Sequence, residues 1–564
     1  MKTPRAATRA GQDDARSTFS RRDALALLLG APLAAEACRF LPKRRFDGAN
    51  RGGAAAVGHR IRHADATVER ASGNGAPTRV DIAIVGAGPS GLSAAWRLER
   101  LGERGYAVFD LEAQAGGTSA YGTDGVVPYP WGAHYVPLPS ADNRALVELL
   151  REIGAIEAVE TDGDGRAVVR ASERALVREP EERLFIDGAW RQGLYPFFGA
   201  SAEDLRELGR FAKQIDEWVG AVDVAGRRAF TVPLHRCSTD ARFTALDRIS
   251  AASFLARAGY RSPRLRWYVE YACRDDYGLA LDETSAWAMA FYFAARVRSP
   301  GGAGAPFVTF PEGNGRLVRH LAGAIGDRLA LGRLVTDVVP GEDHVELAVF
   351  DVASGALRRV IADHVILAVP RFVALRLLRP FRDAPPPQSA AFTTSPWMVA
   401  NLHLRARPPS DGFPFAWDNV LYDSPSLGYV VATHQQLADT GPTVWTYYHP
   451  FVDRDPSDAR RRLFSLDHDA LVDGVMADVG RAHPGLEDFV TRVDTWKWGH
   501  AMIRPVPGFI WGEARRRASE PLGRVHFAHT DLSGLALFEE AQHHGVRAAE
   551  AVLVARGRTI ASLI

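Results

Sequence analysis

The sequence is short of cysteine, of lysine and of net charge, and each shortage excludes a class of protein. Three cysteines in 564 residues exclude a disulfide-stapled scaffold and a cysteine-based metal site. A formal net charge of +1 leaves no basic surplus for binding nucleic acid. No stretch reaches the roughly 20 apolar residues that a membrane-spanning helix needs. With 46% hydrophobic residues, the composition is typical of a globular protein with two or three domains.

The shortage of lysine draws attention to the few that are present. Only four of the 68 cationic side chains are lysines, and one of them, Lys497, lies between two tryptophans in the stretch Thr495–His500. An ammonium group can lose its proton on burial, whereas a guanidinium group cannot. Lys497 and His500 are therefore candidates for catalysis. The alternative is a lysine stem that packs on tryptophan with its charged end in water.

The first 38 residues follow the pattern of an export signal. The pair Arg21-Arg22 precedes a short, uncharged apolar run from Ala24 to Ala35, and small residues follow up to Cys38. This predicts a twin-arginine-type signal peptide over residues 1–38, recognised by the twin-arginine export machinery, and a periplasmic or extracellular protein. Cys38 is a candidate lipid anchor. The alternative is an amphipathic or disordered N-terminus.

Residues 39–78 are rich in Gly, Ala and Arg and have no periodicity, which predicts a flexible linker. An apolar, β-branched run, Ile82–Val85, then leads into Gly86-Ala-Gly-Pro-Ser-Gly91 and helix-favouring sequence. The first glycine permits a tight turn, the second a close backbone approach to phosphate, and the third close packing of helix on strand. The strand Tyr106–Phe109 ends at Asp110, where a carboxylate would bind a ribose.

This frame predicts a bound dinucleotide. Its predicted contacts are Gly86, Ala87, Gly88, Pro89, Ser90, Gly91, Asp110 and Leu111. Periodicity further along the chain predicts helices over 144–153, 202–219, 251–258 and 276–296, and then a strand from 307 with a helix to 325. Strands are predicted over 334–339, 344–350 and 362–370, and the sequence over 390–515 is strand-rich. A strand over 524–528 and a helix over 538–555 complete the prediction.

Four blocks in this order resemble the flavin-containing amine oxidase superfamily, which includes monoamine and polyamine oxidases, protoporphyrinogen oxidase and carotenoid desaturases. The blocks are the Gly86–Gly91 turn, Gly116-Gly117, Phe310–Leu317, and a C-terminal block from Phe527 to Ala549. The resemblance implies non-covalent FAD and an α/β fold. A Rossmann-like FAD-binding domain would come from 79–142, 306–376 and 519–558. An α+β substrate domain with a mixed or antiparallel sheet would come from 143–305 and 377–518.

The resemblance also implies roles for single residues. Val338 and Val339 would contact the adenine, Asp531 the ribityl chain and pyrophosphate, and the helix after Glu540 would point at the flavin pyrimidine. Further expected cofactor contacts are Gly116, Gly117, Thr118, His134 and Ala541.

Two departures from the family pattern stand out. Thr118 stands where the family has an arginine, so one phosphate contact is missing. The lysine that holds a water at flavin N5 is absent near Ala400 and Asn401.

Other side chains are candidates for the chemistry. His134, His500 and His544 could accept protons near neutral pH, and the alternative for each is a structural histidine. Asp275-Asp276 and Glu539-Glu540 are interpreted as solvated or capping carboxylates, and their spacing matches no metal site. A local excess of Trp and Tyr predicts a substrate pocket for a flat or cationic molecule, although a sheet core would explain it equally well. Its predicted walls are Trp417, Tyr429, Trp496 and Trp498.

These features favour an exported FAD-dependent oxidoreductase that oxidises an amine, amino acid or related small molecule by hydride transfer to flavin N5, with O2 as acceptor. The alternative enzyme is a desaturase or dehydrogenase of a bulky apolar substrate that passes electrons to a quinone or cytochrome. A third hypothesis, a non-catalytic flavoprotein subunit, follows from the missing lysine.

Overall fold

The computed structural model describes residues 45–564 apart from 63–66, 73–74, 164, 166, 298, 303, 437–438 and 453–454. The predicted signal peptide and Cys38 lie outside the described residues. All elements below belong to one unit, Phe46–Ile564. No described helix combines the length and the apolar character needed to cross a membrane.

The first sheet has a parallel centre that brings together distant parts of the chain. Its strands are β1 (Thr78–Val85), β2 (Tyr106–Phe109), β11 (Leu329–Ala330), β12 (Arg333–Pro340), β13 (Val345–Asp351), β14 (Leu357–Leu367) and β20 (Val525–Phe527), in the order β11-β2-β1-β14-β13-β12 with β20 also paired to β14. At the centre, Ile84 of β1 is in register with Val108 and Ile366. These central residues are fully buried, as expected for parallel strands that helices cover.

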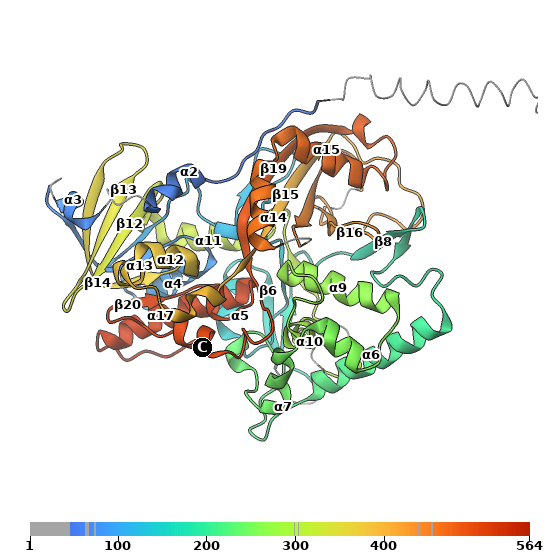
Figure 1. Cartoon of the computed structure of the whole chain (residues 1–564), viewed down its shortest axis with the longest axis horizontal. Coiled ribbons are helices and arrows are strands. Elements are labelled where there is room, and N and C mark those ends of the chain that lie inside the picture. Colours follow the sequence, from blue (N-terminus) through green and yellow to red (C-terminus); the bar gives the residue numbers. More distant parts are fainter. Residues whose placement is uncertain are drawn as a thin grey trace, which may run out of the picture. The chain divides into compact units, whose positions relative to one another are not determined.

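The helices beside this sheet come from early, middle and late parts of the described chain. They are α4 (Pro89–Arg100), α5 (Arg144–Glu152), α11 (Gly315–Ile325) and α17 (Phe538–Ala555). A Cβ on Gly545 of α17 would lie 2.1 Å from the Ser90 carbonyl oxygen of α4, so the two helices touch backbone to backbone. Figure 1 shows α17, near the C-terminus, beside α4 and β14.

The strands of a second sheet carry five tryptophans and three tyrosines. Its strands are β8 (Glu182–Ile186), β9 (Ala189–Gln192), β15 (Thr394–Leu404), β16 (Asp418–Leu421), β17 (Gly428–Val431), β18 (Thr443–Pro450) and β19 (Val490–Ile503), in the order β19-β15-β18-β17-β16-β8-β9. All pairs are antiparallel except β16 with β8. Every residue of β15 is buried because it lies between β18 and β19. The fold is thus the expected α/β class with a second, mixed sheet.

A helical layer completes the unit. It contains α6 (Ala202–Gly220), α8 (Ala251–Arg257), α9 (Pro263–Tyr277) and α10 (Ala286–Ala294). The predicted single helix over 276–296 is wrong. Helix α9 ends where Gly278 adopts a left-handed conformation (φ 61°), and α10 begins after Ser285, whose side chain caps it.

Two further predictions need correction. The strand-rich stretch 390–515 also contains α14 (Pro456–Ser465) and α15 (His468–Val479), each capped at its N-terminus by an aspartate side chain. The predicted linker 39–78 is not a free linker over its described part, because Asp47 and Asn50 form β-bridges with β19 and are followed by α2 (Ala55–Gly58) and α3 (Val68–Ser72). The predicted helices at 144–153 and 538–555 are confirmed as α5 and α17.

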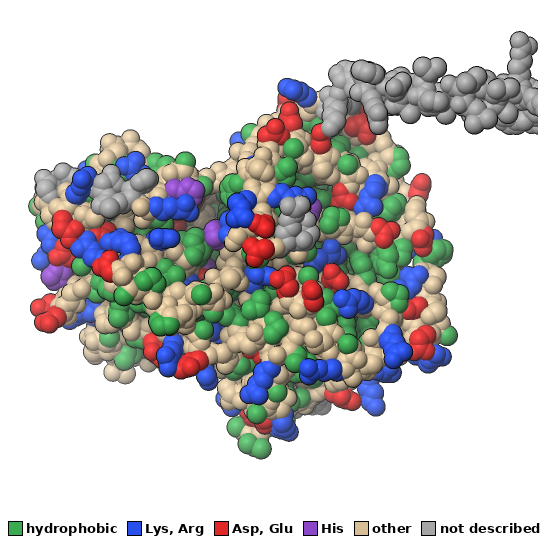
Figure 2. All heavy atoms as spheres, viewed as in Figure 1, with side chains coloured by type: hydrophobic (Ala, Val, Ile, Leu, Met, Phe, Trp, Pro, Cys, Tyr) green, Lys and Arg blue, Asp and Glu red, His purple; other side chains and the backbone are tan. Residues whose placement is uncertain are grey.

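The smaller elements are β3 (Tyr121–Gly122), β4 (Tyr129–Pro130), β5 (Tyr135–Pro137), β6 (Ile156–Thr161), β7 (Ala167–Ala171), β10 (Phe307–Thr309), α7 (Ala241–Thr244), α12 (Arg371–Leu377), α13 (Arg379–Asp383) and α16 (Glu513–Ala518). On the face drawn in Figure 2, acidic and basic side chains are interspersed. The domain boundaries given above stay a prediction.

Candidate active site

The turn after β1 has the geometry of a phosphate cradle. Gly86 has a φ of 102°, and a Cβ on Gly91 would lie 1.9 Å from the Gly86 carbonyl oxygen. A Cβ on Gly117 would lie 3.2 Å from the Cα of Gly88, so these two backbones face each other without side chains between them. Pro89 begins α4, whose N-terminal N–H groups favour an anion. The turn and the double glycine therefore come together as predicted.

Asp110 lies beside this turn at the end of β2. Its carboxylate accepts hydrogen bonds from the backbone N–H groups of Ala87 (2.5 Å) and Glu112 (2.8 Å). Burial raises the pKa of Asp110, and the two N–H groups act against that rise. The carboxylate borders a cavity, called the outer cavity here, whose inner wall includes Gly86, Asp110, Leu111, Leu334 and Val335.

The predicted adenine contacts, Val338 and Val339, do not line the outer cavity. Val338 is fully buried within the sheet, and Val339 packs against the small cluster of Val68 and Ala71. Leu334 and Val335 line the cavity instead, because they lie near the start of β12, next to the end of β2. The hydrogen bond from the Arg333 N–H to the Asp110 carbonyl (2.6 Å) holds the start of β12 beside the end of β2.

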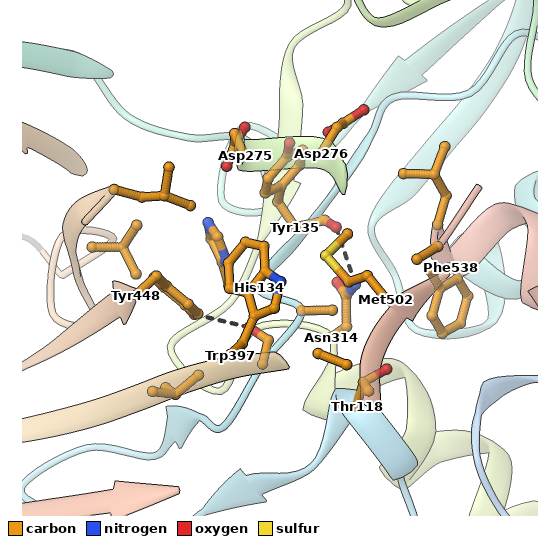
Figure 3. A pocket seen from close by; sticks show the side chains of 18 of the residues that line it. Thr118, His134, Tyr135, Asp275, Asp276, Asn314, Trp397, Tyr448, Met502 and Phe538 are labelled. Carbon is orange, nitrogen blue, oxygen red and sulfur yellow. Dashed lines mark hydrogen bonds between the residues drawn. The ribbon is translucent and has the colours of Figure 1, made fainter. Parts of the chain in front are cut away.

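A second cavity, the inner pocket, is bordered by the residue after the double glycine, Thr118. Its cavity volume is about 140 Å³. Figure 3 shows Thr118 and Asn314 on one side, Asp275 and Asp276 on the opposite side, and His134 between them.

Seven of the 24 residues that line the inner pocket are aromatic. The His134 ring stacks on Tyr448, with ring centroids 4.9 Å apart, and the Tyr448 hydroxyl donates to the Gly132 carbonyl (2.8 Å). Burial lowers the pKa of His134 to about 4, so this ring is neutral at physiological pH. The Trp498 indole N–H donates to the Trp131 carbonyl (2.6 Å), and this hydrogen bond fixes the orientation of the Trp498 ring.

Of the four predicted pocket aromatics, Trp498 alone lines the inner pocket. Trp417 and Trp496 lie behind it, in contact with His134 and Trp498. Tyr429 lies on the other side of the second sheet, where its hydroxyl bonds to His483 (2.6 Å). The prediction for Tyr429 is wrong because neighbouring strand residues point to opposite faces.

Buried carboxyl groups form the polar part of the inner pocket. Asp275, Asp276, Asp418 and Glu539 all line it, and Arg296 is the one arginine or lysine among its described lining residues. The guanidinium of Arg296 donates two hydrogen bonds to Asp276 (2.9 and 3.0 Å), and both side chains are more than nine-tenths buried. The other three carboxyl groups make no ion pair with a described residue, although the charge of Arg296 acts on Asp275 and Glu539.

Burial dominates the titration of these three groups. It raises the pKa of Asp275, the charge of Asp276 adding to the effect, and it raises the pKa of Glu539 to about 7. The pKa of Asp418 lies well above its usual range, because burial and the nearby Asp275 both disfavour its charge. The pocket is thus built to accept positive charge.

The interpretation of Asp275-Asp276 and Glu539-Glu540 as solvated or capping carboxylates is wrong. Asp275 and Asp276 lie in the last turn of α9, and Glu539 in the first turn of α17, and all three face the inner pocket. Glu540 is also buried and accepts hydrogen bonds from the Leu234 N–H (2.6 Å) and the Ser533 hydroxyl (2.6 Å). For Glu539-Glu540 the available signal was an acidic pair directly after the apolar run Leu535–Phe538.

Lys497 does not line the inner pocket, so the structure gives no support to its predicted catalytic role. Its ammonium group donates to the Leu466 carbonyl, beside the turn between α14 and α15. Trp496 and Trp498 flank it in β19 and belong to the aromatic cluster around the inner pocket, so the alternation of strand side chains turns Lys497 away.

The two predicted catalytic histidines also lie outside the inner pocket. His500 borders the outer cavity, stacks on Phe372 (3.9 Å between centroids) and bonds to the Thr394 hydroxyl (2.8 Å). A register shift between β15 and β19 at Ser395 accompanies this placement. His544 is buried and bonds to the Ser533 hydroxyl (2.7 Å).

The remaining predicted cofactor residues, Asp531 and Ala541, are buried in the C-terminal part. Asp531 accepts a hydrogen bond from the Arg371 N–H (2.7 Å) and pairs with His529 (3.1 Å). The charge of His529 and the hydrogen bonds from His529 and Arg371 keep the pKa of Asp531 low despite its burial. Ala541 lies in the first turns of α17.

A glycine cradle, an acid at the end of β2 and a pocket with aromatic walls next to the cradle are the arrangement expected of an oxidoreductase that uses a dinucleotide. The chain matches the model of the flavin-containing amine oxidoreductases over residues 89–553, and it belongs to this family. The residues present fit FAD, the cofactor of this family. The glycine cradle leaves no room for a Cβ, and it lies between the two cavities bordered by Gly86 and Thr118. The protein is therefore an FAD-dependent oxidoreductase with a small-molecule substrate.

Solved structures share this fold. A wild-type putrescine oxidase bound to putrescine superposes with a TM-score of 0.61 at 19% identity, covering 85% of this chain and 100% of that one. Cyclohexylamine oxidase from Brevibacterium oxydans IH-35A gives a TM-score of 0.59 at 18% identity with the same coverage. No curated protein matched the sequence significantly.

Proposed function

We propose that the protein is an exported amine oxidase whose substrate is an extended amine with at least two cationic nitrogens. The observation that carries this proposal is the carboxyl content of the inner pocket, where four carboxyl groups and one guanidinium line the wall. Ionised carboxyl groups are costly to bury unless a cation accompanies them. Bound ammonium groups would favour the ionised form of the carboxyl groups whose pKa is raised, and two ammonium groups would do so more than one.

The geometry also suggests how the substrate is held. Asp275 and Asp276 lie across the pocket from Thr118, which borders the cofactor cradle. A cationic nitrogen bound near Asp275 would leave the other end of an extended molecule beside the flavin. Aromatic walls such as Trp498 and Tyr448 would exclude water and favour a cation on their faces.

The chemistry requires a neutral nitrogen at the reacting end. Bound FAD would accept a hydride equivalent from the carbon next to that nitrogen, with O2 as the final acceptor. An ammonium substrate must first lose a proton, and a carboxylate with a pKa near neutrality can take it. Glu539, with a pKa of about 7, lies on the wall of the pocket and is the group that we assign to this proton.

The first experiment follows the flavin absorbance near ~450 nm during anaerobic mixing of the holoenzyme with a diamine and with the monoamine of equal length. We expect the diamine to bleach the band, air to restore it, and the monoamine to need at least about tenfold higher concentration, since one lost ion pair costs about 1.4 kcal/mol or more. Bleaching by apolar or anionic compounds alone would contradict the proposal.

A matched pair of variants tests the role of the pocket charge. Asp418→Asn should raise KM for the diamine about tenfold, because it removes a buried carboxyl group from the wall. The control is Asp423→Asn, an exposed aspartate a few residues along the chain, which should leave KM unchanged. Equal KM values for both variants would show that the pocket charge does not select the substrate.

Export is a separate part of the proposal and rests on the sequence pattern around Arg21-Arg22. Replacing this pair by Lys-Lys should keep the protein in the cytoplasmic fraction with its flavin bound. The same replacement at Arg44-Arg45 is the control and should leave export unchanged. Secretion of the Arg21→Lys, Arg22→Lys protein at the normal level would contradict twin-arginine export.

A further inference from the structure

The segment Phe46–Arg62, called the N-terminal strap here, connects the second sheet with the outer cavity. Its backbone pairs with the edge of β19. The Val493 N–H donates to the Asp47 carbonyl (2.8 Å), and the Thr495 N–H donates to the Ala49 carbonyl (3.0 Å). In return, the Arg51 backbone N–H donates to the Thr495 carbonyl (2.7 Å). Figure 1 shows this segment, in dark blue, running beside β19 to α2.

Charged groups fix the strap at two points. The buried carboxylate of Asp494 accepts hydrogen bonds from the Ala49 N–H and the Arg51 side chain (3.0 Å each). The Ala54 N–H then donates to both carboxylate oxygens of Glu112 (3.2 Å each), two residues after Asp110. The strap is therefore anchored on a strand of the second sheet and on the loop next to the ribose-binding acid.

Beyond Ala54 the strap becomes a wall of the outer cavity. Ala55, Gly58, His59, Ile61 and Arg62 line that cavity, opposite Gly86 and Asp110. The approach is close, because a Cβ on Gly58 would lie 3.1 Å from the Leu111 side chain. Removing the strap would leave the cavity beside Asp110 with a wall missing.

The strap also brings positive charge to this cavity. Arg62 lines the outer cavity and has no ion pair with another described residue, whereas the guanidinium of the neighbouring Arg60 lies 4.3 Å from the centroid of the Phe350 ring. Arg62 and His500 both line the outer cavity, and burial together with the charges of Arg460 and Arg62 lowers the pKa of His500 to about 4. In Figure 2, basic and histidine side chains gather at the surface beside α2.

The diphosphate of FAD is the one charged part of that cofactor, and Thr118, beside the cradle, carries no charge to meet it. We propose that the N-terminal strap is part of the FAD site. Arg62 binds the diphosphate, and the docked strap retains the adenosine half of the cofactor. This inference concerns the cofactor alone and does not depend on which amine is oxidised.

The first test undocks the strap without changing any residue of the outer cavity. Gly48 has a φ of 132°, and a Cβ there would lie 1.9 Å from the Val493 carbonyl oxygen, so Gly48→Ala should lift the strap from β19. Gly52→Ala is the matched control, since its Cβ would meet nothing closer than 3.7 Å. The readout is the rate at which flavin fluorescence appears when the holoenzyme is diluted.

We expect Gly48→Ala to release FAD at least about tenfold faster than the parent protein and Gly52→Ala to change the rate less than about twofold. Release at the parental rate from a Gly48→Ala protein with an unchanged circular dichroism spectrum would overturn the role of the strap in retention.

The second test concerns the charge and does not depend on the folding of the first variant. Arg62→Ala should raise the Kd for FAD about tenfold and weaken its dependence on salt, because one charge-assisted contact to phosphate is lost. Arg60→Ala, at a neighbouring position with its side chain on Phe350, is the control and should leave Kd unchanged. Equal Kd values for the two variants would overturn the assignment of Arg62.

Discussion

The outer cavity and the inner pocket lie at the two ends of the same cofactor cradle, and they are built in different ways. The inner wall of the outer cavity comes largely from backbone at the ends of neighbouring strands, at Gly86, Asp110 and Val335. The inner pocket is lined by side chains that include those of α9, β16 and α17, and four carboxyl groups and one guanidinium are among them. A cofactor shared by a family can be held by a backbone turn, whereas a particular substrate needs side chains from many elements.

The largest expected effect concerns the backbone part. Gly91→Val would place a branched side chain where even a Cβ comes within 1.9 Å of the Gly86 carbonyl, so the cradle cannot form. We expect the purified variant to contain no flavin. Gly209→Val in α6, where a Cβ would meet nothing within 4 Å, should keep its flavin. A yellow Gly91→Val protein would break the comparison, because the outer cavity would then not depend on the glycine backbone.

The next effect concerns the buried ion pair of the inner pocket. Asp276→Ala should lower the free energy of unfolding by about 3–5 kcal/mol, because it leaves the Arg296 guanidinium buried without a partner. Asp275→Asn should act in the opposite direction, since it removes a like charge from Asp276. Urea unfolding of the two variants measures both values, and a loss of stability in both would contradict this account of the pocket.

The pH dependence of stability gives a smaller effect. Folded Glu539 keeps its proton up to a pKa of about 7, against 4.5 for the ordinary side chain, so the folded state binds more protons between these values. The free energy of unfolding should therefore fall as the pH rises from about 4 to 7, by up to about 3 kcal/mol for this group.

Binding of a cationic, non-oxidisable amine should restore the free energy of unfolding that ionised Glu539 removes at higher pH. Its stabilising effect on Tm should be larger at pH 8 than at pH 5, and Glu539→Gln should reduce the difference. Equal shifts of Tm at the two pH values would show that the pocket carboxyl groups do not respond to the ligand.

The smallest effect is expected at Lys497, which lies in neither cavity. Lys497→Met should leave kcat/KM within about twofold, because the ammonium group contacts the Leu466 carbonyl and no reacting atom. Steady-state oxidation of the best amine measures it. A loss of more than about tenfold with normal flavin content would require Lys497 to reach the inner pocket and would contradict the observed orientation.

The same contrast explains what could be predicted from the sequence. The turn Gly86–Gly91 and the helix α17 were predicted because neighbouring residues determine them. Asp275, Asp418 and Glu539 were not predicted as a group, since only the tertiary fold brings them together. Helices α14 and α15 were missed because their capping aspartates lie in a stretch dominated by aromatic strands.

Lys497 shows an error that the sequence itself could have prevented. Its rarity suggested a function, yet in a strand it cannot share a face with both Trp496 and Trp498. Once these aromatics were assigned to a pocket wall, period-2 alternation placed Lys497 on the opposite face. The N-terminal strap had no such signal, because its contacts with β19 are made by backbone groups.

The contact between Gly545 and Ser90 has a consequence for biosynthesis. More than 400 residues separate α17 from α4 in the chain, yet α17 packs directly on α4, the helix that carries the cradle. The nascent chain therefore cannot assemble this layer until α17 has left the exit tunnel. A polypeptide truncated before α17 should be synthesised without acquiring its colour.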